Sequence, residues 1–359
     1  MQQSYFAKVL ISGKEVLHNQ VVEVQDGIVK SIYSNDAGIS VNFKGHYLVP
    51  TFIDLQIYGA AGKLFSMYPT ADSLQTITAD SKLHGTSQIL ITIATNTDAV
   101  VFKSIDAVRE YWNTGGTGII GLHLEGPWIN KVKRGAHIES LIQNPDVSVV
   151  DRILKYGKDV VKMITLAPEV SSNEVTELIK SYGIVISAGH SNATLAEASQ
   201  SFSMGITAVT HLFNAMSSFH HRDIGLPGAA FMHDSVMASI IVDGHHVDFN
   251  AIKIAKQLMG DRLFLITDAV AETKEGPYQH RYSDGRYLSD NTLSGSALTM
   301  LQAVKNCIAH CDISAEEAFK MASFYPAKLL NLPGGNIELN QRASFVLLDE
   351  GFDLLTVCT

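Results

Sequence analysis

The chain has 359 residues, of which 46% are hydrophobic and 18% are charged, so it can bury one large core, with room for a barrel of about 250 residues and a small accessory domain. The net charge of −9, from 27 basic and 36 acidic residues, argues against nucleic acid and membrane surfaces as partners. Three cysteines without a Cys-x-x-Cys pair, no signal-peptide pattern and no long apolar run predict a soluble, cytoplasmic protein with reduced thiols.

The first 48 residues have the composition of short strands joined by turns. Apolar and β-branched residues cluster at 7–13, 21–24 and 28–33. Asp26-Gly27 is a typical hairpin signal between the last two of these runs. We therefore expect a small β-structure at the start of the chain.

The larger part of the chain, residues 49–333, alternates apolar strands with segments of helical period. Eight strands are predicted, at 48–58, 87–94, 118–124, 160–167, 183–188, 207–211, 237–242 and 262–267. Helical segments between them include 71–83, 148–156, 172–181, 195–204 and 249–258, and polar N-cap residues precede two of these, at 171–174 and 191–194. Eight strands with intervening helices predict a (β/α)8 TIM-type barrel, because an open doubly wound sheet rarely needs so many.

Beyond the last barrel strand this alternation loosens. Charged and polar residues at 272–290 predict a loop. Helical periods return at about 297–311 and 314–330, so two helices are expected before the tail.

The tail returns to strand character at 343–348, and we expect it to pair with the N-terminal strands. Residues 1–48 and 334–359 would then form a small discontinuous β-sandwich domain. The chain ends at Thr359, soon after this run, which leaves open whether the domain has all of its edge strands.

Four predicted barrel strands end in residues that can bind a metal or carry a proton. Glu125, His190, His211 and Asp268 each close an apolar run. Because the C-terminal ends of the strands form the active-site face of a barrel, these side chains are expected to meet there. One carboxylate and two imidazoles form the ligand pattern of a catalytic zinc site, in which the ion acidifies a water molecule.

Asp268 leaves three roles open on this pattern. It could be a fourth ligand, a carboxylate that orients a ligand histidine, or the general base that takes a proton from water. The role of base requires hydrogen-bond reach to that water. A closed barrel permits this, because its eighth strand neighbours the first and faces the ligands across the mouth.

Further polar residues fall in loops that are expected at the same mouth. They are His137, His220, His221, Arg222, His245 and His246. An arginine there suits bidentate binding of a phosphate. Composition alone leaves the alternative that the stretch around Arg222 is an ordinary solvated loop.

Eight segments that span nearly the whole chain carry a resemblance to a known family. They are Pro50-Thr-Phe-Ile-Asp54, His123-Leu-Glu-Gly-Pro-Trp128, Lys133-Arg-Gly-Ala-His137, Ala188-Gly-His-Ser-Asn-Ala-Thr194, Thr210-His-Leu-Phe-Asn-Ala-Met216, Asp243-Gly-His-His-Val-Asp248, Thr267-Asp-Ala269 and Leu293-Ser-Gly-Ser296. In these segments and their order the chain resembles the N-acetylglucosamine-6-phosphate deacetylases of the amidohydrolase superfamily. The second and fifth segments are the most specific.

The resemblance implies hydrolysis of N-acetyl-D-glucosamine 6-phosphate to D-glucosamine 6-phosphate and acetate, in amino-sugar catabolism, with one divalent metal ion, for which Zn²⁺ is favoured. It implies metal ligation by Glu125, His190 and His211, and acid/base catalysis by Asp268. It implies sugar contacts from Ala136, His137, Asn214, Ala215, His246, Leu293, Ser294 and Gly295. It also implies a homodimer in which Arg222, as the phosphate-binding residue, and His246 come from the partner subunit.

The first barrel strand departs from the pattern of many amidohydrolases, which carry His-x-His there and bind two metals. This chain has Gln56-Ile57-Tyr58 at that place. An amide oxygen and a neutral phenol are poor zinc ligands, so we expect the second metal site to be missing and the demand on a protein base to rise. Whether Tyr58 enters the pocket is left open.

Three other functions are compatible with parts of this pattern. One is the same hydrolysis on another N-acetylhexosamine 6-phosphate, such as the galactosamine epimer, which no residue here distinguishes. Another is a non-catalytic sugar-phosphate sensor, against which the intact set of metal-binding and acidic residues argues. A cyclic-amide hydrolase of the wider superfamily is disfavoured because the ligands of a second metal are absent.

Overall fold

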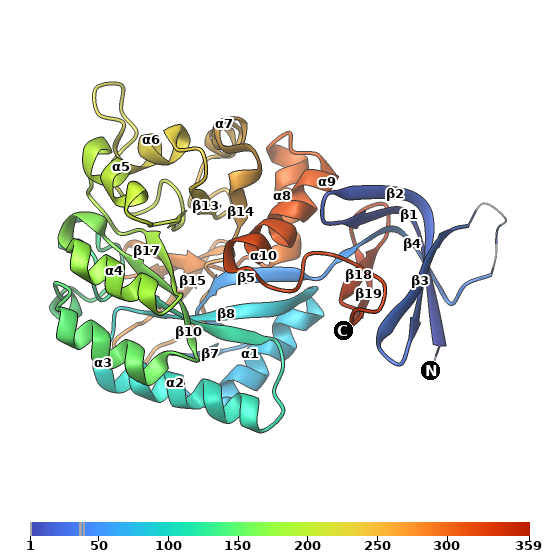
Figure 1. Ribbon diagram of the computed structural model, residues 1–359, viewed down its shortest axis with the longest axis horizontal. Helices are drawn as coiled ribbons and strands as arrows, with labels where there is room; N and C mark the ends of the chain where they lie inside the picture. The colour runs from blue at the N-terminus through green and yellow to red at the C-terminus, as the bar shows by residue number, and fades with distance from the viewer. Residues whose placement is uncertain (1, 36–37, 39) are drawn as a thin grey trace.

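Eight parallel strands form the barrel of the larger part of the molecule (Figure 1). The computed structural model describes residues 2–35, 38 and 40–359. The barrel strands are β5 (Phe52–Ile57), β8 (Thr86–Ala94), β9 (Ile119–Glu125), β10 (Val161–Leu166), β11 (Val185–Ala188), β12 (Ala208–Val209), β13 (Met237–Ile240) and β14 (Leu263–Leu265). They follow one another around the sheet in chain order. Backbone hydrogen bonds from Tyr58 N to Ala269 O (2.8 Å) and from Asp268 N to Gln56 O (2.9 Å) then join the last strand to the first, and the predicted barrel is confirmed.

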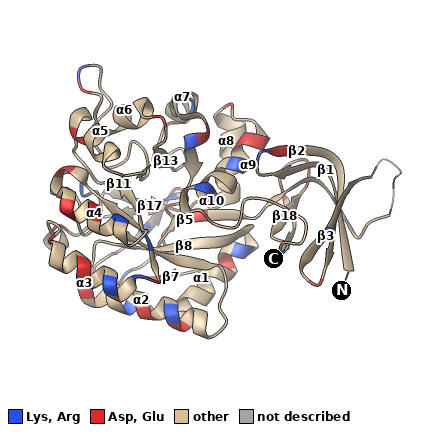
Figure 2. Ribbon diagram, in the orientation of Figure 1, with Lys and Arg blue, Asp and Glu red and all other residues tan. Residues whose placement is uncertain are grey.

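Helices cover the barrel, and charged residues are distributed along the outer ones, as Figure 2 shows for α2, α3 and α4. The helices are α1 (Ala71–Leu83), α2 (Asp98–Asn113), α3 (Val147–Gly157), α4 (Asn173–Ser181), α5 (Leu195–Ser203), α6 (Gly225–Met232) and α7 (Phe249–Met259). As predicted, α4 begins at the N-cap Ser172, and α5 begins at Thr194, which forms a capping box with Glu197. Within the described ranges, no helix has the length and apolar character needed to cross a bilayer.

The predicted loop at 272–290 is wrong in one respect, because it contains a hairpin. Strands β15 (Arg281–Ser283) and β16 (Arg286–Ser289) pair antiparallel, and β16 pairs in turn with β17 (Thr292–Ser296). The signal was Asp284-Gly285, a typical two-residue hairpin turn between short strands. A smaller hairpin, β6 (Gly59–Ala60) with β7 (Lys63–Leu64), follows the first barrel strand.

After α8 (Met300–His310), the single helix predicted at 314–330 is also wrong. The structure has two helices there, α9 (Ala315–Ala322) and α10 (Phe324–Leu330). Pro326 lies in the first turn of α10, where a missing backbone N–H costs nothing. In one continuous helix the Pro326 ring would clash with the carbonyl of Ala322, so the helix is interrupted at Ser323.

Strands from both ends of the chain form one six-stranded sheet beside the barrel (Figure 1). Their order is β19 (Leu354–Cys358), β18 (Phe345–Leu348), β4 (Phe43–Pro50), β1 (Gln2–Ser12), β2 (Glu15–Gln25) and β3 (Ile28–Ser34). Phe345 and Leu347 share a buried core with Tyr5 and Leu10, and a fully buried side chain of this size contributes about 1.5–3 kcal/mol. Strand β19 forms one edge of this sheet, next to β18.

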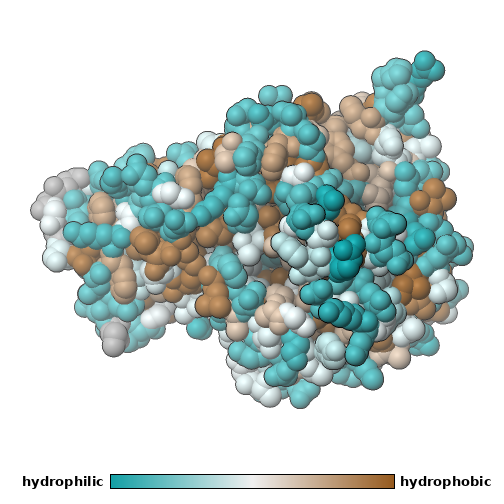
Figure 3. Space-filling model, turned by 180° about the vertical axis from the view of Figure 1, so that it is seen from behind, coloured by the Kyte–Doolittle hydropathy of each residue, from teal (hydrophilic) through white to brown (hydrophobic). Residues whose placement is uncertain are grey.

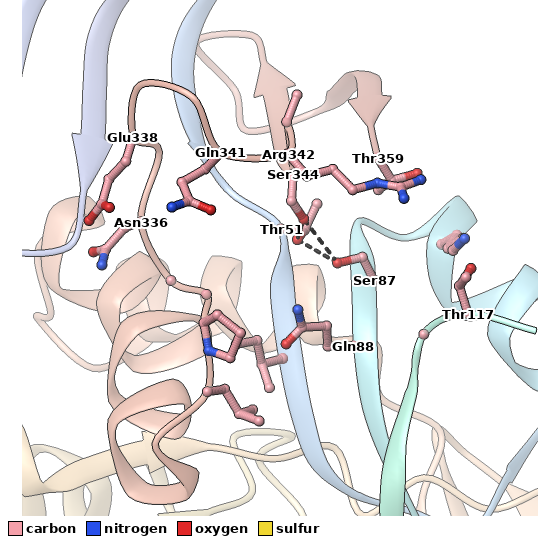
Figure 4. Close-up of a pocket in the computed structure, with 18 residues that line it drawn as sticks. Thr51, Ser87, Gln88, Thr117, Asn336, Glu338, Gln341, Arg342, Ser344 and Thr359 are labelled. Carbon is pink, nitrogen blue, oxygen red and sulfur yellow. Dashed lines mark hydrogen bonds between the residues drawn. The ribbon is translucent and has the colours of Figure 1, made fainter. Parts of the chain in front are cut away.

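The small sheet and the barrel meet at a cavity of about 510 Å³ (Figure 4). The hydroxyl of Thr51, between β4 and β5, lies 2.5 Å from Oγ of Ser87 on β8 and 2.7 Å from Oγ of Ser344. Seen from behind, hydrophobic residues gather where the two parts meet (Figure 3). This cavity lies at the N-terminal ends of β5 and β8, so it is at the opposite end of the barrel from the predicted catalytic residues.

Candidate active site

A pocket of about 270 Å³ lies at the C-terminal ends of the barrel strands, on the face where such barrels carry their active sites. All of the site residues that the resemblance implied except Arg222 line it, whereas His220, His221 and His245, also expected at this mouth, do not. The implied residues that line it are Glu125, Ala136, His137, His190, His211, Asn214, Ala215, His246, Asp268, Leu293, Ser294 and Gly295.

Three of these residues bring potential metal ligands together. Oε1 of Glu125 lies 3.3 Å from Nε2 of His190 and 3.0 Å from Nε2 of His211, and the two nitrogens are 3.1 Å apart. A tetrahedral ion that binds each ligand at about 2.0–2.1 Å would separate them by about 3.4 Å. The three atoms therefore have the spacing that a divalent metal ion requires.

His137 also lies close to this group, and its Nε2 could join Glu125 and His190 as a ligand. Its hydrogen bonds argue against that role. The backbone N–H of Thr95 donates to Nδ1 of His137 at 3.3 Å, so the proton of the neutral ring is on Nε2, which donates to Oε2 of Glu125 at 3.0 Å. His190 is the opposite case, because its Nδ1 donates to the carbonyl oxygen of Lys133 at 2.9 Å and leaves a lone pair on Nε2.

The charge states of the site follow from burial and from neighbouring charges. Burial alone would raise the pKa of the Glu125 carboxyl, but His190, His137 and His211 outweigh it and hold that pKa well below its usual range. Burial, helped by His190, lowers the pKa of His137 to about 4. At neutral pH, Glu125 is therefore ionised and His137 is neutral.

Tyr58 enters the pocket, which the sequence left open. Its hydroxyl donates a short hydrogen bond to Oε2 of Glu125. The amide nitrogen of Gln56 lies 2.9 Å from Oε1 of Glu125, 2.9 Å from the Tyr58 hydroxyl and 2.8 Å from Oδ1 of Asp268. Hydrogen-bond donors from the first barrel strand thus contact both carboxylate oxygens of Glu125, at positions where a second metal would need ligands.

Asp268 is held by the backbone where the barrel closes. Its N–H donates to the carbonyl of Gln56, and its own carbonyl accepts from Ser296 N, both at 2.9 Å. Burial, helped by the nearby Glu125 charge, raises the pKa of the Asp268 carboxyl well above its ordinary value. Gly295 completes this support, because its φ is +122° and a side chain there would meet the Asp268 carbonyl at 3.0 Å.

The backbone is strained at three of the predicted residues. His190, His211 and Asp268 have φ values of 47°, 36° and 56°, which lie in the left-handed region that residues other than glycine rarely adopt. Such conformations cost about 1–3 kcal/mol each and persist only where the surroundings impose them. This strain turns the three side chains inward as each strand ends.

His246 and Arg222 have different locations in the structure. His246 lines the pocket of its own chain, and its Nδ1 lies 2.6 Å from Oδ2 of Asp243, which corrects the expectation that it comes from a partner subunit. Arg222 is exposed in the loop between β12 and α6, which projects from the barrel in Figure 1 and is hydrophilic in Figure 3. Its Nε donates to His221 at 3.2 Å, and no described carboxylate pairs with it.

The sequence missed some residues that shape the pocket. Tyr278 and His280 line it, and the Tyr278 hydroxyl donates to the carbonyl of Thr95 at 2.6 Å. The Thr95 hydroxyl also lies 2.7 Å from Nδ1 of His137, so this residue helps to fix that ring. Thr95 follows a predicted strand end and had that signal, whereas nothing in the polar segment around Tyr278 indicated a pocket wall.

A (β/α)8 barrel with these carboxylate and imidazole groups on its active-site face defines a metal-dependent hydrolase. Residues 47–357 match the Amidohydrolase family, and the chain belongs to this family. It is 29% identical to N-acetylglucosamine-6-phosphate deacetylase of Haemophilus influenzae, over 97% of this chain and 95% of that protein. It is 32% identical to N-acetylgalactosamine-6-phosphate deacetylase of Shewanella sp. strain ANA-3, over 98% and 93%. The crystal structure of N-acetylglucosamine-6-phosphate deacetylase from Pasteurella multocida superposes with a TM-score of 0.92, at 30% identity, and covers 99% of this chain and 98% of that one.

Proposed function

We propose that the protein hydrolyses N-acetyl-D-glucosamine 6-phosphate to D-glucosamine 6-phosphate and acetate. The observation that carries this proposal is the convergence of Glu125, His190 and His211 beside the buried Asp268. Similar relatives named for this deacetylation support the choice of substrate.

The proposed cofactor is one divalent ion per chain, Zn²⁺, held by Glu125, His190 and His211. Two imidazole nitrogens and one carboxylate oxygen are a ligand set that suits zinc. When bound, the ion would supply Lewis-acid polarisation of water and of the acetyl carbonyl. The donors of Gln56 and Tyr58 support a single ion, because these two residues stand in the place of second-metal ligands and already donate to Oε1 and Oε2 of Glu125.

Asp268 is the proposed general base and then general acid. Its Oδ1 accepts from Gln56, whereas Oδ2 accepts from no described residue and is available to an attacking water molecule. The carboxylate would take the proton of that water and return it to the departing amine nitrogen. Its raised pKa favours holding the proton between the two steps.

His137 is the proposed donor to the oxygen of the acetyl group. The N–H of Nε2 donates to Glu125 in this structure, and with substrate bound it would donate its hydrogen bond to the acetyl oxygen as negative charge develops there. A neutral imidazole can give this hydrogen bond without carrying a charge of its own.

The remaining predicted residues would hold the sugar phosphate. Ala136, Asn214, Ala215, His246 and the Leu293–Gly295 segment line the pocket and offer backbone and side-chain hydrogen bonds to the sugar. In a homodimer, Arg222 would bind the phosphate group of a substrate molecule that lies in the pocket of the partner subunit. Its exposure on a projecting loop, without a carboxylate partner among the described residues, supports this arrangement.

Acetate release from N-acetylglucosamine 6-phosphate by the metal-loaded protein is the decisive test. Parallel kcat/KM values on the galactosamine epimer separate the two sugars, and the Shewanella relative makes that comparison necessary. If the protein binds either sugar phosphate and releases no acetate, it is a sensor and not a deacetylase. The cytoplasmic location and the domain division at residues 48 and 334 stay predictions.

A further inference from the structure

An arginine without an acidic partner among the described residues lies on a strand next to one that lines the pocket. Arg286 is on β16, whose neighbour β17 carries the pocket-lining residues Ser294 and Gly295. On its other side Arg286 donates from Nη1 to Nδ1 of His245 at 3.4 Å. The next residue after His245 is His246, which lines the pocket, so Arg286 connects β16 to the segment that carries this wall residue.

The guanidinium of Arg286 is incompletely satisfied. Its Nε is buried and has no hydrogen-bond partner among the described residues, and no described carboxylate forms an ion pair with it. Burying a charged donor without a partner is costly, which argues that a missing group completes this site. An ordinary solvated surface arginine would instead expose its nitrogens to water.

The pocket itself supplies no other cation of this kind. No lysine or arginine is among the residues that line it. Arg134 borders it, but its Nη1 donates to the carbonyl of His137 at 3.0 Å, and its Nε lies 3.6 Å from the Glu139 carboxylate. Among these neighbouring arginines, Arg286 is the one whose charge remains uncompensated.

We propose that Arg286, held in place by His245, is a phosphate-binding residue supplied by the same chain as the catalytic groups. Its ligand class is a phosphate monoester on a sugar bound in the pocket, and the inference therefore rests on the proposed function. A phosphate monoester carries about −1.5 to −2 charge at neutral pH, so it can engage this guanidinium and the proposed Arg222 of a partner together. Arg286 would make recognition of the phosphate partly independent of the oligomer.

The kinetic test compares Arg286→Gln with the matched control Arg281→Gln. Arg281 is an exposed arginine on the neighbouring strand β15 and also has no ion pair among the described residues. For N-acetylglucosamine 6-phosphate, Arg286→Gln should raise KM about tenfold or more, and Arg281→Gln should leave it unchanged. For unphosphorylated N-acetylglucosamine, both variants should match the wild type. Arg286→Lys keeps the positive charge but lacks the planar guanidinium, so its KM for the phosphorylated sugar should lie between that of the wild type and that of Arg286→Gln.

A direct binding measurement separates failure of this inference from failure of the proposed function. Calorimetry with inorganic phosphate on the metal-loaded protein should give about tenfold weaker binding for Arg286→Gln than for Arg281→Gln. Equal phosphate affinity of the two variants, or equal losses by Arg286→Gln on both sugars, overturns the subsite. If the wild type releases no acetate, the proposed function fails, and the phosphate titration still decides the role of Arg286.

Discussion

The amide nitrogen of Gln56 donates a hydrogen bond of 2.8 Å to Oδ1 of Asp268. The same nitrogen lies 2.9 Å from Oε1 of Glu125, so one side chain fixes the proposed base relative to a proposed metal ligand. The first barrel strand therefore positions Glu125 and Asp268 in this protein, at the place where a His-x-His pattern would supply ligands for a second metal.

Asp268→Asn should fold, keep its metal and lose about 10³-fold in kcat. The amide can still accept the hydrogen bond from Gln56, but it cannot take a proton from water. Steady-state acetate release, together with elemental analysis of the same sample, measures both properties. A variant that retains a tenth of the normal turnover would show that Asp268 is not the base.

Purified protein should contain about one equivalent of divalent metal per chain. Gln56 and Tyr58 stand where a second ion would need ligands, and they donate hydrogen bonds to Oε1 and Oε2 of Glu125. Elemental analysis after dialysis gives the count, and chelation should abolish activity and lower Tm, because the ion binds only the folded site. Two tightly held equivalents would contradict this interpretation of the first strand.

His137→Ala should lower kcat by about 10²–10³-fold, because one hydrogen bond to a developing oxyanion contributes about 3 kcal/mol. KM should change little, since this hydrogen bond strengthens mainly in the transition state. Metal content serves as the control that separates a donor from a ligand. A variant that loses its metal would move His137 into the metal site.

Arg222→Ala should raise KM for the phosphorylated sugar and barely affect the unphosphorylated one. The reason is that its charge meets only the phosphate in the proposed dimer. Size-exclusion chromatography of the variant checks that the oligomer is unchanged. Equal losses on both sugars would assign Arg222 to structure.

Asp54→Asn should change how stability depends on pH. Burial raises the pKa of Asp54 from 3.8 to about 6, despite hydrogen bonds from Thr267 and the Gln56 backbone. The folded protein therefore binds this proton more tightly than the unfolded chain, so the Asp54 contribution to stability falls as pH rises from about 4 to about 6. Relative to Asp54→Asn, the wild type should lose about 3 kcal/mol across that window. Urea unfolding of the metal-free proteins at pH 4, 5 and 7 measures it, and a constant difference between them would refute the assignment.

The barrel and most of the pocket could be predicted from the sequence because both depend on local patterns. Apolar runs that end in Glu125, His190, His211 and Asp268 identify strand ends, and parallel topology brings those ends together. The resemblance to a family added the smaller pocket residues, which carry no chemical signal of their own.

Features that depend on tertiary contacts could not be predicted from the sequence. The orientation of Tyr58 towards Glu125 follows from the closed barrel, and the proton on Nε2 of His137 follows from its contact with Thr95. The resemblance placed His246 in the partner subunit, whereas it lines the pocket of its own chain, and only the fold shows where the segment around it lies. The break at Ser323 had a local signal in Pro326, which the helical period outweighed.

The six-stranded sheet has a consequence for how the chain is made. Strand β4 pairs with β1 on one side and with β18 on the other, although β18 lies about three hundred residues later in the sequence. During synthesis the first four strands emerge early, and β4 keeps one unpaired edge until β18 has been made. An open edge of this kind can pair with another nascent chain, so the pairing of β18 with β4 also protects the newly made protein against aggregation.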